Sequence, residues 1–349
     1  GRLTGPREVT VDGTAYTGAH LVLASGSYSR SLPGLEVDGE RVLTSEHALR
    51  LERVPSSVVV LGGGVIGSEF ARVWRSFGAD VTIVEALPRL VAAEDAASSK
   101  ALERAFRKRG IGFRTSTRFS SVEHTDSGVA VTVEDAKGET SVIEAELLLV
   151  AVGRGPATDG LGYAEQGVAM ERGFVLADER CRTNLEGVYA VGDIVPGLQL
   201  AHRGFQQGIF VAEEIAGLAP VPVEESAIPR VTYSHPEIAS VGLDEETARS
   251  TYGDGAIETL TYDLGGNGKS QILQTQGFVK LVRRTDGPVV GVHMVGDRVG
   301  ELVGEAQLIY AWEAHPDDVA PLVHAHPTQN EALGEAHLAL AGKPLHAHG

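Results

Sequence analysis

Residues 57–70 read SVVVLGGGVIGSEF, and this stretch decides the fold. Ser57–Leu61 is rich in β-branched residues, as expected of a buried strand. From Val65 to Phe77 the apolar residues fall on one helical face, at Ile66, Phe70, Val73 and Phe77. Gly62–Gly67 has the spacing G-x-G-x-x-G and lies between the two elements. A strand, a glycine turn and a helix in this order predict an α/β, Rossmann-like domain.

The glycines also predict a ligand. Gly62 is expected to make the tight turn, Gly64 to let a pyrophosphate approach the backbone, and Gly67 to let the helix pack closely on the strand. The helix N-terminus adds free N–H groups and a positive dipole end. We therefore expect dinucleotide binding by Gly62, Gly63, Gly64, Val65, Ile66 and Gly67. The alternative is a glycine-rich turn that binds nothing.

Two carboxylates refine this prediction. Glu85 follows the next predicted strand, Val81–Val84, where it can accept hydrogen bonds from an adenosine ribose diol and repel a 2′-phosphate. This favours NAD over NADP. Glu69 is expected in the first turn of the helix, where it either complements the helix dipole or contacts the nicotinamide.

The rest of the chain divides into segments with different patterns. Residues 1–50 contain a hairpin from Glu8 to Tyr16 and a strand at Leu21–Ala24. Residues 51–154 continue the βαβ pattern with a helix at 98–108, a small antiparallel insert within 119–145 and a returning strand at 147–152. Residues 155–222 contain a strand at 187–191 and a helix from about Phe205 to Ala216. From residue 223 onward, strands near 231, 278–282 and 289–294 precede helices near 300–312 and 331–340. This order predicts a separate α+β domain.

Composition excludes several classes of protein. The formal net charge of −17, from 47 acidic and 30 basic residues, opposes nucleic-acid binding. No apolar run reaches the length of a membrane span, so no membrane association is expected. Cys181 is the only cysteine, which excludes an intrachain disulfide and fits a cytoplasmic protein. The first residues contain neither a methionine nor a signal peptide, and we expect them to be the middle of a longer protein.

Several motifs occur in a characteristic order along the chain. They are Ala24–Ser27, Gly62–Glu69, Val152–Arg154, Gly187–Asp193, Leu200–His202, Tyr233–Glu237 and His326–Thr328 with Glu331. Over essentially all 349 residues the chain resembles the flavoprotein disulfide reductases, and among them the dihydrolipoamide dehydrogenases. The resemblance implies a Rossmann-like NAD-binding domain within the remainder of an FAD-binding domain, and a C-terminal dimerisation domain. The implied divisions are FAD-domain remnant 1–50, NAD domain 51–154, central FAD segment 155–222 and interface domain 223–349.

The resemblance also assigns cofactor roles. Asp193 would bind the ribityl chain of FAD, and the start of the following helix would lie along the flavin, at Gln199, Leu200, Ala201 and His202. The segment Ser25, Gly26 and Ser27 would close over FAD, although relatives usually have Thr at the position of Ser25 and Pro at that of Ser29. Gly153 and Phe119 fall where the family contacts NAD.

His326 and Glu331 resemble the acid–base pair of this family. An imidazole titrates near neutral pH, and a carboxylate on its other nitrogen fixes the tautomer. Pro327 is expected to hold His326 extended before a helix. The competing interpretation is a capping box, with Thr328 as N-cap and Glu331 as its N3 partner. Both roles can coexist on different carboxylate oxygens.

We assign no catalytic or metal-binding role to the other histidines or to the single cysteine. His324 with His326, and His346 with His348, could each chelate a metal, but no third ligand has suitable spacing, so we expect no metal site. His235, which precedes a proline, is interpreted as a structural turn residue. Cys181 is interpreted as a loop thiol without a nucleophilic role.

The implied reaction is oxidation of the dihydrolipoyl groups of a 2-oxo acid dehydrogenase complex by a homodimer. Electrons would pass through a disulfide and FAD to NAD. Relatives begin with a first G-x-G-x-x-G for FAD and a Cys-x-x-x-x-Cys pair, which have no counterpart here, so we expect these 349 residues alone to be inactive on lipoamide. Two alternatives stay open: another FAD- and NAD(P)-dependent disulfide reductase, and a non-catalytic dimeric NAD-binding module.

Overall fold

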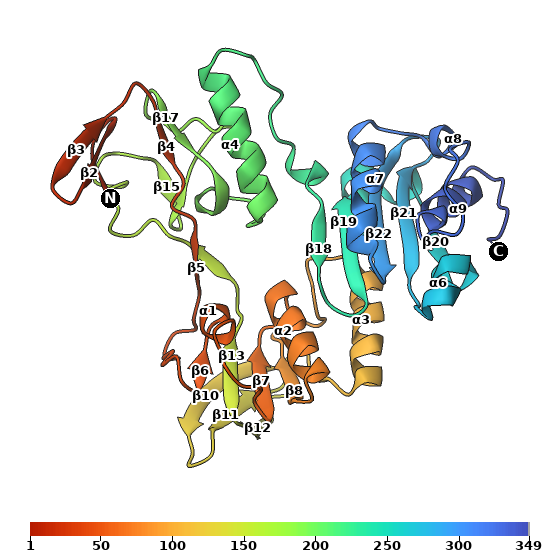
Figure 1. Ribbon diagram of the computed structural model, residues 1–349, viewed down its shortest axis with the longest axis horizontal. Helices are drawn as coiled ribbons and strands as arrows, with labels where there is room; N and C mark the ends of the chain where they lie inside the picture. The colour runs from red at the N-terminus through yellow and green to blue at the C-terminus, as the bar shows by residue number, and fades with distance from the viewer. Residues whose placement is uncertain (348–349) are drawn as a thin grey trace. The chain divides into compact units, whose positions relative to one another are not determined.

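Segments distant in sequence fold together in the computed structural model, which describes residues 1–347 (Figure 1). One unit, called unit 1, contains residues 1–30 and 153–225. The other, unit 2, contains residues 31–152 and the chain from residue 226 onward. The divisions therefore fall near residues 30, 153 and 225, whereas the sequence suggested 50, 154 and 222.

The first half of unit 2 is built around a five-stranded parallel sheet of order β6-β13-β7-β8-β9 (Figure 1). Its strands are Val42–Leu43, Leu147–Val150, Ser57–Leu61, Asp80–Val84 and Gly112–Arg114. The helices are α1 (Ser45–Ala48), α2 (Val65–Ser76) and α3 (Ala96–Arg109). The strand and helix predictions for this region are confirmed to within two residues at each end. The returning strand, β13, ends at Val150, two residues before its predicted end.

Local chemistry explains the bounds of α3 and the form of the insert. Asp95 caps α3 by accepting a hydrogen bond from the Ala97 amide at 2.9 Å, and Gly110 ends the helix in the left-handed conformation, φ 74°. The insert is an antiparallel sheet of β10 (Arg118–His124), β11 (Val129–Glu134) and β12 (Thr140–Ala145). Alternate side chains of β11 are buried, as in a strand with one face on a core.

The second half of unit 2 is an antiparallel sheet of order β18-β19-β22-β21-β20 with helices around it (Figure 1). Its strands are Arg230–Thr232, Glu237–Gly242, Val289–Gly296, Phe278–Arg284 and Ile257–Asp263. The helices are α5 (Glu245–Tyr252), α6 (Gly268–Leu273), α7 (Val299–Ala311), α8 (Pro316–Val319) and α9 (Glu331–Leu340). Short 3-10 turns occupy Glu225–Ala227, Asp254–Ala256 and Leu264–Gly266.

The α+β character of this region is confirmed, but the expectation that its strands all precede its helices is wrong. Strands β19 and β20 and helices α5 and α6 all precede β21, and none of them was predicted. Strand β19 is buried along nearly its whole length, so its sequence EIASVG lacks the alternation that marks a half-exposed strand. Helices α7 and α9 share one apolar core with β21 and β22, to which Leu302, Ala306 and Leu333 contribute.

A buried ionic cluster fixes the start of α3 against the antiparallel sheet. The Lys280 ammonium contacts both carboxylate oxygens of Asp95, at 2.9 and 3.0 Å, and a Glu245 oxygen at 2.7 Å. The Ser240 hydroxyl donates to Glu94 at 2.6 Å. Ionic contacts between residues so far apart in sequence hold the two halves of unit 2 together.

Unit 1 contains four small strand groups and one long helix (Figure 1). Strands β1 (Arg2–Gly5), β2 (Glu8–Val11) and β3 (Thr14–Thr17) form an antiparallel sheet, so the predicted hairpin is confirmed. The pairs are β4 (Leu21–Leu23) with β17 (Val188–Ala190), β5 (Ser27–Ser29) with β14 (Arg154–Pro156), and β15 (Met170–Glu171) with β16 (Phe174–Val175). A 3-10 turn, η1, occupies Gly192–Ile194.

Helix α4 runs from Ala201 to Ile215, so its predicted start at Phe205 is wrong. The first turn, Ala-His-Arg-Gly, has no apolar periodicity, yet its backbone already bonds as a helix, with the Gly204 amide donating to the Leu200 carbonyl at 3.2 Å. Cys181 is buried in a turn, and burial raises the pKa of its thiol to about 11. This agrees with a thiol that is not a nucleophile. Within residues 1–347, no helix has both the length and the apolar character needed to cross a membrane.

Candidate functional site

The backbone of the Gly62–Gly67 turn explains why two of its glycines are needed. Gly62 has φ 104°, and a Cβ there would lie 2.3 Å from the Ala151 carbonyl oxygen. A Cβ on Gly67 would lie 1.9 Å from the Gly62 carbonyl oxygen, because α2 packs directly on the turn. Both distances are far below van der Waals contact, so only glycine fits.

Gly64 has a different environment. It is the N-cap of α2, and a Cβ built there meets no atom within 4 Å. Its glycine is therefore not required by the packing of the protein itself. Open space beside the N-terminus of a 12-residue helix suits a pyrophosphate, which needs close approach to free backbone N–H groups. The turn thus fits a dinucleotide.

Glu85 lies beside this turn, at the carboxyl end of β8. One of its carboxylate oxygens accepts from the Gly63 amide at 2.6 Å, and the other accepts from the Leu87 amide at 2.7 Å. These two bonds fix the carboxylate at the edge of the glycine turn, where an adenosine ribose is expected.

Glu69 is not in the first turn of α2, because the helix begins at Val65. The interpretation as a dipole-complementing residue is therefore wrong. Its carboxylate accepts from the Tyr233 amide at 2.8 Å, and burial raises its pKa above the usual range of a glutamate. Phe119, on β10, packs against an apolar core that the insert shares with the parallel sheet, and Gly153 has φ 106° and belongs to unit 1.

In unit 1, the structure brings Ser27 and Asp193 together from distant parts of the sequence. The Ser27 hydroxyl donates to Asp193 at 2.5 Å, and the Arg154 Nε donates to the same hydroxyl at 2.6 Å. Arg154 also donates to the Ser27 carbonyl at 2.8 Å. Sequence reasoning gave Arg154 no role of its own, although it belongs to the Val152–Arg154 motif.

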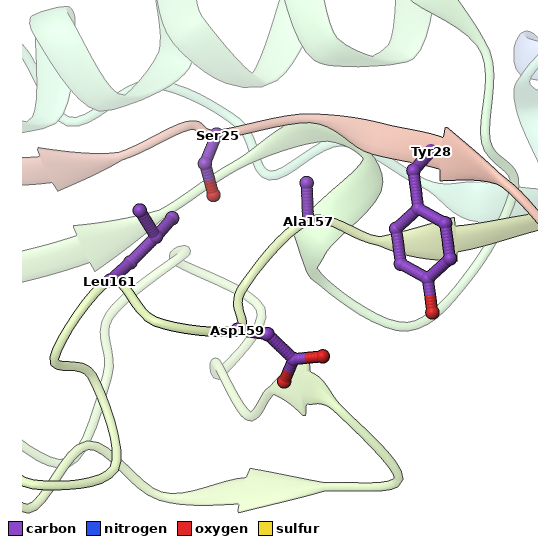
Figure 2. A pocket seen from close by; sticks show the side chains of 5 residues that line it. All are labelled: Ser25, Tyr28, Ala157, Asp159 and Leu161. Atoms are coloured by element: carbon purple, nitrogen blue, oxygen red, sulfur yellow. The ribbon is translucent and has the colours of Figure 1, made fainter.

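Unit 1 also contains an open pocket of about 400 Å³, and two of its lining residues, Ser25 and Tyr28, flank Gly26 and Ser27 in the sequence. Figure 2 shows Ser25 and Tyr28 facing it from the β4–β5 segment, and Ala157, Asp159 and Leu161 on the loop that follows β14. The Tyr163 hydroxyl donates to Ser25 at 3.3 Å. Gly26 has φ 77°, in the left-handed region that favours glycine.

The turn that presents Asp193 is clamped by helix α4. The Gln207 side-chain oxygen accepts from the Gly192 amide at 2.8 Å, and Arg203 donates to the Gly192 and Pro196 carbonyls at 3.2 and 2.6 Å. Arg203 is buried and pairs with Glu225. Neither Arg203 nor Gln207 was predicted, because a helical sequence pattern does not show which turn its polar side chains contact.

The remaining residues predicted to contact flavin lie at the start of the same helix. The Gln199 side-chain amide donates to the Asp193 backbone carbonyl at 3.4 Å, and Leu200 is the N-cap of α4. Ala201 and His202 begin the helix and are exposed. The structure therefore groups Asp193, Gln199 and the first turn of α4 as the resemblance implied.

The His326–Glu331 pair is formed in unit 2. The His326 Nδ1 and the Glu331 Oε1 are 2.8 Å apart, and the other Glu331 oxygen accepts from the Thr328 amide at 2.8 Å. Burial opposes ionisation of Glu331, but the Thr328 amide and His326 outweigh it and lower its pKa. The carboxylate thus serves the imidazole and the loop backbone at once, one oxygen to each.

The capping-box prediction is correct for Glu331, which accepts from the Thr328 amide, but wrong for Thr328 as the N-cap. Helix α9 begins at Glu331 with Asn330 as N-cap, so Thr328 is not the N-cap. The Thr328 hydroxyl donates to the Ala325 carbonyl at 2.6 Å instead of bonding the amide at Glu331. The His326–Pro327 and His235–Pro236 peptide bonds are cis.

The described members of the two histidine pairs, His324, His326 and His346, each contact a carboxylate. Within residues 1–347, no group of three or more His, Cys, Asp or Glu side chains is arranged to hold a metal ion. His324 instead pairs with Glu305, and His346 with Glu335. His348 lies outside the described residues.

Comparison with known proteins assigns the family. Residues 1–208 match the pyridine nucleotide-disulphide oxidoreductase family, and residues 228–337 match the dimerisation domain of that family. The chain belongs to the pyridine nucleotide-disulphide oxidoreductases. Members of this family that share this architecture use FAD and NAD(H), which confirms the cofactor prediction.

Individual relatives agree with this assignment. The chain is 39% identical over 330 residues to a dihydrolipoyl dehydrogenase of Bacillus subtilis (strain 168), covering 93% of this chain and 69% of that protein. It is 37% identical over 355 residues to the mitochondrial dihydrolipoyl dehydrogenase of Pisum sativum, covering 99% and 70%. The crystal structure of LpdA from Mycobacterium tuberculosis superposes with a TM-score of 0.86 at 28% identity, covering 95% and 72%.

Proposed function

We propose that these residues provide the NAD-binding, flavin-binding and acid–base parts of a dihydrolipoyl dehydrogenase. The observation that carries the proposal is the His326–Glu331 pair at 2.8 Å, on a chain whose relatives act as dihydrolipoyl dehydrogenases. The relatives do not favour either alternative, another disulfide reductase or a non-catalytic module.

The geometry of the pair supports proton transfer. With Glu331 accepting from Nδ1–H, the imidazole keeps its lone pair on Nε2, and the His326 side chain is 77% exposed. Nε2 can then take the proton of a dihydrolipoyl thiol and leave a thiolate, while Glu331 stabilises the imidazolium. FAD, held by the segments around Ser25–Ser27 and Asp193, would supply the redox chemistry that links the dithiol to NAD.

We assign NAD to the Gly62–Gly67 turn with Glu85, and contacts beyond the ribose to Glu69, Phe119 and Gly153. FAD is assigned to Ser25–Ser27, Asp193 and the segment Gln199–His202. The hydrogen-bonded chain of Ser27, Asp193 and Arg154 fits this role, because it fixes the Asp193 carboxyl group where hydroxyl donors of a ribityl chain could reach it.

The partners follow from the same assignment. We infer a homodimer formed by residues 223–349, in which the dyad reaches the flavin site of the other subunit. The substrate is the dihydrolipoyl group of a 2-oxo acid dehydrogenase complex. We also infer a cytoplasmic location, to which the single cysteine is suited.

The test compares two electron routes in a protein that carries a redox-disulfide segment joined to these 349 residues. We expect His326→Ala to lower dihydrolipoamide oxidation by roughly 10²- to 10⁴-fold, as for the loss of a general base. Oxidation of NADH by ferricyanide should stay intact, since that route needs no thiol deprotonation. Glu331→Gln should lose less, because it keeps the base. Undiminished lipoamide turnover in His326→Ala would refute the proposed role.

A further inference from the structure

The orientation of His326 depends on its loop more than on packing. The side chain is mostly exposed, and its one hydrogen bond among the described residues is to Glu331, five positions along the same loop. An imidazole so exposed is not held by surrounding atoms. Whatever fixes residues 324–331 therefore fixes the acid–base pair.

Glu305 holds this loop at two points, one before His326 and one before Glu331. One of its carboxylate oxygens is 2.8 Å from the His324 Nε2, and the other accepts from the Asn330 side-chain amide at 2.7 Å. His324 is two residues before His326, and Asn330 immediately precedes Glu331. A single carboxylate thus ties together the chain before the base and the chain before its partner.

Glu305 is part of helix α7, which is packed into an apolar core. Its neighbours on α7, Leu302, Val303, Ala306 and Ile309, are all buried in the core of the antiparallel sheet. His324 is packed closely on the other side, because a Cβ on Gly334 of α9 would lie 2.6 Å from its Nδ1. Glu305 therefore links α7 to α9 through the loop.

A further hydrogen bond, from Asn267, restrains the middle of the loop. The Asn267 side-chain amide donates to the Thr328 carbonyl at 3.0 Å, and Asn267 itself is buried and caps α6. This contact fixes the backbone next to the Thr328 amide but touches neither residue of the pair. Thr328 in turn bonds the Ala325 carbonyl and Glu331, whereas Glu305 holds the loop at His324 and Asn330.

We propose that Glu305 is a positioning residue, which orients His326 and Glu331 by holding His324, two residues before the base, and Asn330, one residue before its partner. The proposal rests on the proposed function of the dyad. Glu305 has no direct contact with the imidazole of His326, so its effect must pass through the loop. Removing it should loosen the orientation of the base and leave the base itself in place.

The direct test measures the tautomer of His326 in the 349-residue chain. Histidine labelled with ¹⁵N reports which ring nitrogen carries the proton, and His326→Gln assigns the signals. We expect the Nδ1–H form to dominate in the parent chain and a mixture of both tautomers in Glu305→Ala. Glu301→Ala is the matched control, because Glu301 is an exposed glutamate one turn earlier on α7.

Activity gives a second readout in the protein that carries the redox-disulfide segment. We expect Glu305→Ala to lower kcat for dihydrolipoamide by roughly 10- to 100-fold, as for a small misplacement of a catalytic group, with KM for NAD unchanged. Glu305→Gln should recover much of this loss, because its amide can still bond Asn330 and His324. Glu301→Ala should match the parent.

The outcomes separate the two proposals. A single Nδ1–H tautomer in Glu305→Ala, with a fold shown intact by circular dichroism, would overturn the positioning role. An equal loss of activity in Glu301→Ala would also overturn it, since the effect would then come from charge alone. If His326→Ala turned over lipoamide normally, the proposed function would fall, while the tautomer result would still decide whether Glu305 orients the ring.

Discussion

Lys280 is the position at which one substitution should destabilise unit 2 most clearly. Its side chain is 9% exposed, and its ammonium group contacts the carboxylates of Asp95, which is 2% exposed, and of Glu245, which is 32% exposed. In Lys280→Met, Asp95 would keep only the Ala97 amide at 2.9 Å and the Glu245 amide at 3.3 Å. Loss of one partner from a buried pair costs about 3–5 kcal/mol, and we expect that decrease in the free energy of unfolding.

Urea unfolding followed by tryptophan fluorescence measures this effect, because both tryptophans, Trp74 and Trp312, lie in unit 2. Lys100→Met is the matched control, since Lys100 is exposed on α3 and should change stability by at most about 0.5 kcal/mol. Adding Asp95→Asn to Lys280→Met should recover part of the loss by removing the uncompensated charge. A loss below about 1 kcal/mol in Lys280→Met would refute the reasoning.

The pH dependence gives an independent check. Burial opposes ionisation of Asp95, but Lys280 outweighs it and lowers the pKa of Asp95 below its usual value. The stabilisation is therefore present above the unfolded pKa of about 3.9 and is lost as the pH falls through the lower folded pKa. In Lys280→Met the lowering influence of Lys280 is gone while the Ala97 amide and His293 still act, so Asp95 takes up a proton more readily than in the parent. The difference between the two proteins should shrink as the pH falls toward 4.

Two further predictions concern NAD. The chain should bind NADH more tightly than NADPH in a fluorescence titration. Glu85→Ala should reduce the difference between the two affinities. Equal affinities in the parent would contradict the ribose assignment. Gly64→Ala should leave the melting temperature nearly unchanged, because its Cβ meets no protein atom, yet weaken NADH binding by blocking the pyrophosphate. Unchanged NADH affinity in Gly64→Ala would place the phosphates elsewhere.

The sequence predicted best those features that depend on neighbouring residues. The strand, turn and helix from Ser57 to Ser76 follow from local periodicity and glycine spacing, and the structure confirms them. The contact between His326 and Glu331 was also predictable, because the two residues are only five positions apart in the sequence. Strand β19 was missed because a fully buried strand lacks alternation.

Contacts between distant residues were not predictable in the same way. The sequence assigned Ser27 and Asp193 to one cofactor only through a family resemblance, and it did not indicate that Arg154 joins them. The ties from Glu305 to both ends of the dyad loop depend on how α7 packs against α9. That arrangement is set by the whole core, which no local pattern encodes.

The packing of Gly67 on Gly62 has a consequence for how this sequence can change over time. Every amino acid reached from a glycine codon by one coding base change carries a Cβ, and at Gly67 that atom would lie 1.9 Å from a carbonyl oxygen. The codon for Gly67 is therefore free to drift only synonymously. Gly64 has no such restriction from folding, so selection for its glycine comes from the ligand alone. Lineages that abandon the nucleotide should lose Gly64 first and keep Gly67 for as long as the domain folds.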